Sequence, residues 1–137
     1  MKIHWIDDKL AISEAIDNYN ILPAEEITSV INVRGEIHDD INELTKRFIS
    51  YYWIPIPDWQ APRSTQIETF ITLVDSIDGK VLLHCEAGKG RSACLAIAYL
   101  LKKGEVSTVK EGEDYMNKLG HPVDLWHTQY NKLKEHL

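Results

Sequence analysis

The chain has 137 residues, of which 44% are hydrophobic and 26% are charged, as in an ordinary soluble globular protein. This length suits one domain with a real core, so we expect a single domain over residues 1–137. The formal net charge of −6 argues against a nucleic-acid coat or a polybasic membrane anchor. The charged start of the chain does not fit a signal peptide, and the longest apolar run, Ala93–Leu101, is too short to span a membrane.

Cysteine and histidine usage narrows the setting further. Two cysteines without a C-x-x-C pair indicate a reducing cytoplasm rather than a disulfide scaffold. The six histidines lack the spacing of metal ligands, so we expect no metal and no cofactor. We also expect a monomer that binds neither nucleic acid nor a membrane.

The first half of the chain predicts alternating strands and helices. The turn residues at 7–9 separate two short apolar segments, as in a hairpin, and Ser13 can cap a helical turn at 14–19. Apolar spacing predicts a helix over 37–48. Its expected inner face is Ile37, Ile41, Leu44 and Phe48. The expected strands are Ile3–Ile6, Leu10–Ile12, Thr28–Val33 and Ile49–Ile56.

The second half continues this alternation after a loop at 58–63. Thr65 and Glu68 predict a capping box for the next helix, and Ser107 can cap a later one. The expected elements are helix 67–77, strand 80–84, helix 93–101, helix 109–119 and a last helix striped by Trp126, Tyr130, Leu133 and Leu137. We therefore predict an α/β fold with a mostly parallel central sheet of about five strands and helices on both faces.

The stretch Val81–Ser92 combines an apolar run, a loop with two glycines and the start of a second apolar run. This pattern predicts a strand, a tight loop and a buried helix. The N–H groups of such a loop and of the helix N-terminus favour a phosphate-like anion. Cys85 comes at the strand end, where a helix N-terminus and nearby cations favour the thiolate. Arg91 can hold two phosphate oxygens with its planar fork.

Two strand ends are expected to meet in one crevice. Ligands of parallel sheets sit beyond the carboxyl ends of the strands. Cys85 follows one such end and Asp58 follows another. A carboxylic acid on a loop can approach a leaving oxygen and protonate it.

Residues 84–92, with the pattern His-Cys-x-x-Gly-x-x-Arg-Ser, resemble the signature of the cysteine-dependent protein tyrosine phosphatase superfamily. The chain is similar in size to the small dual-specificity phosphatases, above all to archaeal and bacterial members, and the resemblance runs from about Ile27 to the end. Ala93 stands where the family very often has glycine. The resemblance implies a metal-independent hydrolase that dephosphorylates phosphotyrosine, and phosphoserine or phosphothreonine, in proteins through a cysteinyl-phosphate.

The same resemblance implies roles for individual residues. Cys85 is expected to be the nucleophile, Arg91 the phosphate-binding and transition-state-stabilising cation, and Asp58 the general acid. Ser92 is expected to donate a hydrogen bond to the sulfur and ease its departure. The substrate phosphate is expected to lie against Glu86, Ala87, Gly88, Lys89, Gly90 and Arg91.

Two supporting residues complete the expected site. His84 resembles the family histidine that orients the cysteine loop, and Gln129 resembles a late glutamine near the attacking water. For Gln129 the sequence itself favours a solvent-exposed helix position. Glu86 is expected to point outward, because a carboxylate would repel a bound phosphate. Cys94 is expected to be a core residue, with a disulfide to oxidised Cys85 as the alternative.

Other functions stay open at this stage. The loop is similar to that of phosphoinositide phosphatases, but Glu86 stands where those typically carry a second lysine. A nucleotide phosphatase would keep the same mechanism. A phosphate-binding module without turnover would not need the filled catalytic positions. Arsenate reductases of low molecular weight place their loop near the N-terminus, whereas Cys85 is central.

Overall fold

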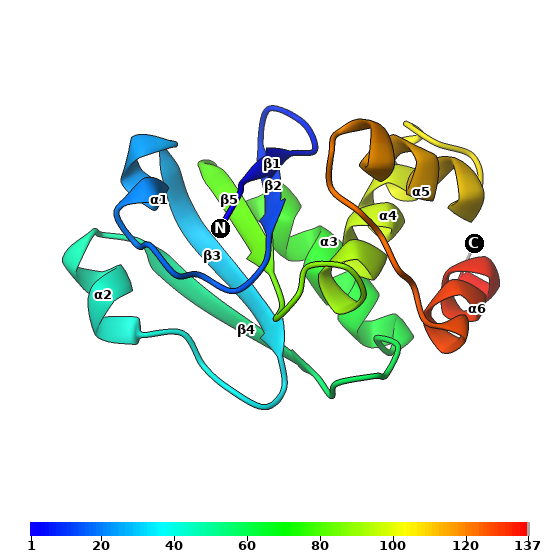
Figure 1. Cartoon of the computed structure of the whole chain (residues 1–137), viewed down its shortest axis with the longest axis horizontal. Coiled ribbons are helices and arrows are strands. Elements are labelled where there is room, and N and C mark those ends of the chain that lie inside the picture. Colours follow the sequence, from blue (N-terminus) through cyan, green and yellow to red (C-terminus); the bar gives the residue numbers. More distant parts are fainter. Residues whose placement is uncertain (137) are drawn as a thin grey trace.

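The computed structural model describes residues 1–136, which form a five-stranded sheet with helices around it (Figure 1). The strands are β1 (His4–Trp5), β2 (Leu10–Ser13), β3 (Ile27–Arg34), β4 (Ser50–Ile56) and β5 (Lys80–His84). The helices are α1 (Ile21–Ala24), α2 (Ile41–Lys46), α3 (Ser64–Ser76), α4 (Arg91–Lys103), α5 (Val109–Lys118) and α6 (His127–His136). Leu137, expected on the last helical stripe, lies outside the described residues.

The sheet has the strand order β1-β2-β5-β3-β4. Strands β2, β5, β3 and β4 pair in parallel, and only the hairpin partner β1 is antiparallel. The predicted α/β fold with a mostly parallel sheet is therefore confirmed. The register aligns Asn32 with His84 and Arg34 with Ile56, so β3, β4 and β5 end at the same edge of the sheet.

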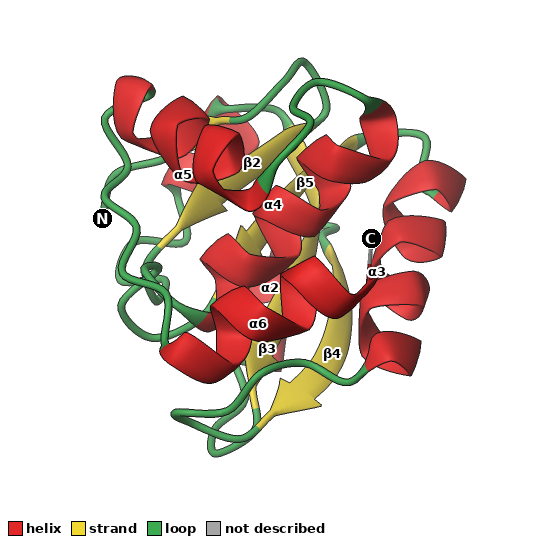
Figure 2. Cartoon of the chain, turned by 90° about the vertical axis from the view of Figure 1, so that its right-hand side faces the viewer, coloured by secondary structure: helices red, strands yellow, loops and turns green. Residues whose placement is uncertain are grey.

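Alternating side chains of the strands bury two separate apolar faces. Val30 and Leu82 point into a core under α1 and α2, whereas Ile31 and Leu83 point into a larger core with α3, α4, α5 and α6. Strands buried on both faces read as continuous apolar runs, which is why β3 and β5 were predictable. Figures 1 and 2 show the sheet between these two helical layers.

Helix α4 is the central helix of the larger layer. Its residues 91–100 are all buried, and α3, α5 and α6 contact it. Gly112 of α5 allows a close approach, because a Cβ there would lie 2.6 Å from Cγ2 of Ile97. This packing fixes the start of α4, and with it Arg91, at the end of β5. Within residues 1–136, no helix has both the length and the apolar character needed to cross a membrane.

The helix predicted over 37–48 is shorter than expected. Only Ile41–Lys46 is helical, and of the predicted inner face only Leu44 is buried. Ile37 and Ile41 are about half exposed, and Phe48 is 93% exposed with a left-handed backbone. The helix begins only at Ile41 and ends at Lys46, so Ile37 and Phe48 lie outside it, and Ile41 lies on a side of the helix that is not buried.

Several predicted caps were shifted by a residue or replaced. Ser13 belongs to β2 instead of capping a helical turn at 14–19. Helix α3 begins at Ser64, where the Gln66 side chain accepts a hydrogen bond from the N–H of Arg63. Thr108, rather than Ser107, caps α5 by accepting from the N–H of Glu111. Neighbouring hydroxyl-bearing residues offer equivalent caps in sequence, so packing decides between them.

Candidate active site

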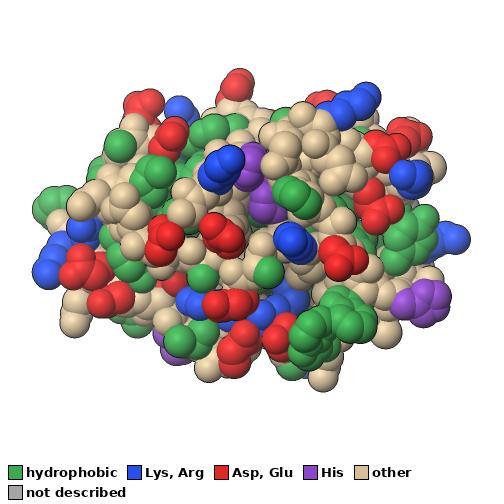
Figure 3. Space-filling view, in the orientation of Figure 1, with side chains coloured by type: hydrophobic (Ala, Val, Ile, Leu, Met, Phe, Trp, Pro, Cys, Tyr) green, Lys and Arg blue, Asp and Glu red, His purple; other side chains and the backbone are tan. Residues whose placement is uncertain are grey.

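The loop between β5 and α4 opens into a pocket of about 340 Å3 at the carboxyl edge of the sheet. The pocket brings Asp58 together with Cys85, as their positions after two strand ends predicted. Its lining residues are Asp58, Trp59, Cys85, Glu86, Ala87, Lys89, Gly90, Arg91, Asp124, Trp126 and Gln129. In Figure 3 this region of the surface mixes basic, acidic and hydrophobic side chains.

Cys85 lies at the base of this pocket and is 3% exposed. Its Sγ accepts a hydrogen bond from the N–H of Gly88 at 3.2 Å. The Oγ of buried Ser92 lies 3.1 Å from the same sulfur. A hydroxyl and an amide N–H aimed at one sulfur stabilise negative charge on it.

The backbone of the loop is shaped as an anion cradle. Gly88 has φ +76°, a backbone conformation that residues other than glycine rarely adopt. A Cβ at this position would also lie 3.1 Å from the carbonyl oxygen of Ser13. Among residues 1–136, no protein acceptor receives the loop N–H groups at positions 86, 87, 89 and 90. Clustered N–H groups at the start of a helix bind phosphate-like anions.

Contacts from outside the loop hold the cradle in place. The carbonyl oxygens of Glu86 and Lys89 accept hydrogen bonds from the N–H groups of Ala15 and Asp124, at 3.0 and 2.9 Å. The Nε2 of His121 donates to the carbonyl oxygen of Gly88. Burial lowers the pKa of His121, which favours the neutral ring that donates from Nε2.

Arg91 is buried and held along one end of its guanidinium group. Nη1 and Nη2 donate to the two carboxylate oxygens of Glu36 at 2.6 and 2.9 Å, and Nη1 also donates to the carbonyl oxygen of Ile56 at 2.9 Å. Burial by itself lowers the pKa of Arg91, but its hydrogen bonds to Glu36 raise that pKa overall. The same bond from Arg91 lowers the pKa of Glu36, so both groups are charged.

These contacts leave one edge of the Arg91 fork for a ligand. A guanidinium has five N–H donors, and the bonds above use three of them. The remaining donors, on Nε and Nη2, lie side by side and match two oxygens of a phosphate. Asp58 stands beside this edge, with its Oδ1 3.6 Å from Nη2.

Asp58 sits on the loop after β4, and its side chain is 54% exposed. Its Oδ1 accepts a hydrogen bond from the N–H of Trp59 at 3.0 Å. The side chain therefore lies at the pocket mouth, beside the Nη2 atom of Arg91.

Behind the loop lies a buried network of charged and polar groups. The Nε2 of His84 lies 2.7 Å from Oδ2 of Asp39, and its Nδ1 lies 3.0 Å from the carbonyl oxygen of Cys85. Because a carbonyl oxygen only accepts, Nδ1 carries a proton. Arg34 donates to the other oxygen of Asp39 at 3.0 Å. His84 therefore ties the Cys85 backbone to a buried ion pair, a position that suits its predicted orienting role.

The remaining loop side chains face outward, at the rim of the pocket. Glu86 is 61% exposed at its side chain, as expected, and pairs with Arg34 at 2.9 Å. This ion pair neutralises the carboxylate that would otherwise repel a phosphate. Ala87 and Lys89 are exposed on the lining of the pocket, and Lys89 adds a positive charge there.

Gln129 is 1% exposed, so its expected place on a solvent-exposed helix face is wrong. Its Oε1 accepts from the N–H of Trp126 at 2.8 Å, and its Nε2 donates to the carbonyl oxygen of Gln60 at 3.2 Å. A Cβ on Gly90 would lie 3.3 Å from the same amide. Gln129 thus joins the cysteine loop, the Asp58 loop and the start of α6.

Cys94 is fully buried on α4, as the sequence favoured. Burial raises the pKa of its thiol to about 12. A thiol attacks a disulfide or sulfenic acid as its thiolate, so this environment disfavours a redox role for Cys94 at neutral pH.

The sequence analysis missed the charged residues at the end of β3 and directly after it. Arg34 contacts Glu86 of the cysteine loop, Glu36 holds Arg91, and Asp39 holds His84 at the end of β5. The signal was present, because Arg34-Gly35-Glu36 follows a strand end as Asp58 does. The missing information was that β3 lies between β4 and β5, which the order of strands in the sequence does not give.

Comparison with known sequences places this chain in a family. A family profile described as "Polymorphic toxin system, DSP-PTPase phosphatase" (Tc-R-P) matches residues 7–105. Human dual specificity protein phosphatase 18 is 37% identical over 94 residues, which cover 64% of this chain and 47% of that protein. Human dual specificity protein phosphatase 5 is 34% identical over 96 residues, covering 67% of this chain and 24% of that protein. The chain spans about half the length of the phosphatase 18 proteins it matches, and less of phosphatase 5.

Solved structures share the fold over nearly the whole chain. Tk-PTP in its active form superimposes with a TM-score of 0.82 and 25% identity, covering 98% of this chain and 95% of that chain. PTPMT1 has a TM-score of 0.83 at 20% identity, covering 98% and 93%, which shows a common fold. With the profile matching residues 7–105 and the cysteine loop, Arg91 and Asp58 meeting in one pocket, the chain belongs to the dual-specificity and protein tyrosine phosphatase (DSP-PTPase) family.

Proposed function

We propose that the protein is a metal-independent phosphomonoester hydrolase that dephosphorylates phosphotyrosine, and phosphoserine or phosphothreonine, in proteins. One observation supports this most strongly. The Cys85 sulfur accepts from the Gly88 N–H and contacts Ser92 inside a cradle that Arg91 completes with a vacant edge. A nucleophile, an oxyanion cradle and a proton donor then surround one position for phosphorus.

In the first step the Cys85 thiolate attacks phosphorus and forms an S–P bond. The P–O bond to the leaving group breaks, and that oxygen takes a proton from the carboxylic acid of Asp58. Arg91 and the loop N–H groups hold the equatorial oxygens as charge spreads over them. The dephosphorylated hydroxyl leaves through the pocket mouth, where Asp58 lies.

In the second step a water attacks the cysteinyl-phosphate and the S–P bond breaks. Asp58, now a carboxylate, accepts the proton of that water, and inorganic phosphate leaves. The sulfur departs as a thiolate, which the Ser92 hydroxyl and the Gly88 N–H stabilise. Gln129 lines the same pocket, where its amide can position the water.

Protein substrates are favoured over phosphoinositides by the charge of the rim. A polyphosphorylated headgroup calls for cations around the loop. Here Asp58 and Asp124 line the pocket beside Lys89, and Glu86, which is paired with Arg34, supplies no further cation. A structure of the related fold PTPMT1 holds PI(5)P, so a lipid substrate is the alternative for this chain. We further propose that this chain acts as a monomer in the cytoplasm, and its two free, buried cysteines are in keeping with a reducing compartment.

The test is hydrolysis of a small aryl phosphate against pH, in EDTA, by the wild-type protein and Cys85→Ser. We expect a bell-shaped profile for the wild type and no turnover for the variant, since one limb reports the thiolate and the other the protonated acid. Retained turnover in Cys85→Ser would overturn the proposal. Saturable phosphopeptide binding without turnover in the wild type would instead indicate a binding module.

A further inference from the structure

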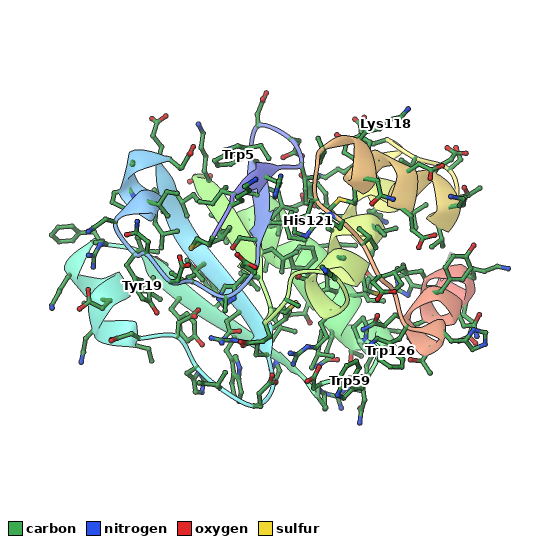
Figure 4. All side chains as sticks on the ribbon, viewed as in Figure 1. Trp5, Tyr19, Trp59, Lys118, His121 and Trp126 are labelled. Carbon is green, nitrogen blue, oxygen red and sulfur yellow. The ribbon has the colours of Figure 1, made fainter. Side chains whose placement is uncertain are left out.

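Two tryptophans stand exposed at the mouth of the candidate active site. Trp59 is 64% exposed and Trp126 is 48% exposed, and both line the pocket that holds Cys85 and Arg91. Their ring centroids are 4.5 Å apart and their planes meet at 86°. Figure 4 places both side chains together at one side of the site, although they come from loops before α3 and before α6.

The backbone of Trp59 has an unfavourable conformation. Trp59 has φ +66°, a left-handed conformation that is uncommon for a bulky side chain and costs free energy. The rings remain in water at the same time, although two exposed indoles are costly to solvate. Neither cost is offset by core packing, so the pair is better explained by a ligand that covers it.

Buried polar bonds fix the two tryptophans relative to the phosphate cradle. Gln129 accepts from the N–H of Trp126 and donates to the carbonyl oxygen of Gln60, the neighbour of Trp59. The same amide packs against Gly90 of the cysteine loop. The two rings are therefore set at a fixed place beside the phosphate position rather than on independent surface loops.

We propose that Trp59 and Trp126 form an aromatic corner that recognises the phenyl ring of phosphotyrosine and makes the enzyme prefer phosphotyrosine to phosphothreonine and phosphoserine. The inference rests on the proposed phosphatase function and names its substrate class. Two perpendicular rings let a third ring stack on one face while its edge meets the other, which is the favoured geometry for aromatic groups. The ring of phosphotyrosine is joined directly to the ester oxygen, so it reaches this corner when its phosphate fills the cradle.

Phosphothreonine and phosphoserine cannot use the corner in this way. Each carries only a short aliphatic link between the ester oxygen and the peptide backbone. With these substrates the peptide backbone, rather than an aromatic ring, lies at the pocket mouth. The faces of the two indole rings then stay partly exposed to water. Aromatic contacts would thus add affinity for one class of phosphoester only.

The test uses two phosphopeptides of identical sequence, one with phosphotyrosine and one with phosphothreonine. Trp126 is the residue to change, because Trp59 is the sequence neighbour of Asp58 and Trp126 is not. The hydrogen bond from the Trp126 backbone N–H to Gln129 does not need the indole side chain. Trp126→Phe keeps a ring, and Phe48→Ala removes an exposed aromatic side chain far from the pocket lining as the matched control. Cys85→Ser supplies the background rate.

We expect Trp126→Ala to lower the phosphotyrosine-to-phosphothreonine ratio of kcat/KM by roughly 3- to 10-fold relative to wild type, as the loss of one aromatic contact predicts. Trp126→Phe should recover most of the ratio, and Phe48→Ala should not change it. Comparing ratios between variants cancels the different leaving abilities of the two hydroxyls. Inhibition by inorganic phosphate should be unchanged in Trp126→Ala, since the cradle is intact.

Two results would overturn the inference, and they are distinguishable. An unchanged ratio in Trp126→Ala, with Cys85-dependent turnover of both peptides, removes the aromatic corner and leaves the phosphatase function standing. The absence of Cys85-dependent turnover of either peptide removes the proposed protein phosphatase function and the inference with it. Phosphatidylinositol phosphate vesicles, assayed in parallel, would then show whether a lipid is the substrate.

Discussion

Arg91 is oriented before any substrate arrives, and that orientation sets how the site can work. The carboxylate of Glu36 accepts hydrogen bonds from Nη1 and Nη2, and the carbonyl oxygen of Ile56 accepts a further one from Nη1. The side chain is 4% exposed, so it has little freedom to find other positions. A fork that is already aligned loses less entropy when it binds phosphate, which is how enzymes stabilise developing charge without reorganisation.

Asp58 gives a prediction at the scale of one residue. In Asp58→Asn the leaving oxygen loses its proton donor while the side chain keeps its size. We expect kcat for a phosphotyrosine peptide to fall by about 100-fold or more, the usual contribution of general acid catalysis. An aryl phosphate with a strongly acidic leaving phenol needs no proton and should lose much less. Equal losses for both substrates, measured at the same pH, would contradict the acid role.

The predictability of the site also varies from residue to residue. Cys85, Arg91 and Ser92 could be named because they share one short loop whose pattern carries its own chemistry. Glu36 and Asp39 could not, because their contacts depend on the order of strands in the sheet. Gln129 was placed on the wrong side of its helix, since helical spacing shows a stripe but not which loops cover its other faces.

At the scale of elements, the segment after β3 holds two residues of the site, His84 and Arg91, through its carboxylates. Asp39 is 7% exposed and joins Arg34, at the end of β3, to His84, at the end of β5. Glu36, from the same segment, holds Arg91. The segment before α2 thus turns Glu36 and Asp39 toward the site, and Ile37 between them is left exposed.

Asp39→Ala is expected to destabilise the protein strongly. It leaves the buried His84 ring without its carboxylate and Arg34 with Glu86 as its remaining acidic partner. Removing one partner of a buried pair costs about 3–5 kcal/mol, and we expect a loss near the lower end of that range because Arg34 stays paired. Asp75→Ala is the matched control, because Asp75 pairs with Lys103 at the surface and such a pair contributes about 1 kcal/mol or less. The measurement is the free energy of unfolding in urea for both variants and the wild type. Similar losses in the two would show that the buried network adds no special stability.

The elements themselves were predictable to different degrees. Strands β3 and β5 and helices α3 and α4 carry apolar patterns that burial imposes directly. The helix expected over 37–48 had a similar pattern, but its apolar residues cover no core. Periodicity records which side chains could share a face, whereas tertiary packing determines whether that face is buried.

At the scale of the whole molecule, the C-terminal segment is tied to the catalytic loop. His121 precedes α6 and donates to the carbonyl oxygen of Gly88, and Asp124 donates from its N–H to Lys89. Gln129 adds the contact to Gly90. Chain segments that are about 30 to 40 residues apart in sequence therefore set the shape of one cradle.

This arrangement predicts a stability that falls in mild acid. Burial lowers the pKa of His121; the bond to Gly88 and the charge of Glu14 oppose that shift, while His4 and Lys89 reinforce it. The unfolded chain therefore binds a proton below about pH 6.5 that the folded chain does not. Unfolding free energy should drop on acidification through this window, by at most about 1.4 kcal/mol per pH unit for this proton.

His121→Gln isolates that effect, because glutamine can still donate to Gly88 but does not titrate. We expect its unfolding free energy to depend less on pH between 7 and 5 than that of the wild type. His127→Gln, at an exposed position in α6, serves as the control and should keep the wild-type slope. An identical pH dependence in His121→Gln and wild type would contradict the expectation.

The central claim is that substrate phosphate passes through the Cys85 sulfur. Rapid quenching of a phosphotyrosine peptide reaction, followed by peptide mass spectrometry, tests it most directly. Ser92→Ala should raise the trapped amount, because the sulfur then departs more slowly in the second step. We predict one phosphate on the peptide that contains Cys85. Two results would contradict the mechanism: turnover at full rate with the phosphate on another residue, or turnover with no phosphorylated residue in either the wild type or Ser92→Ala.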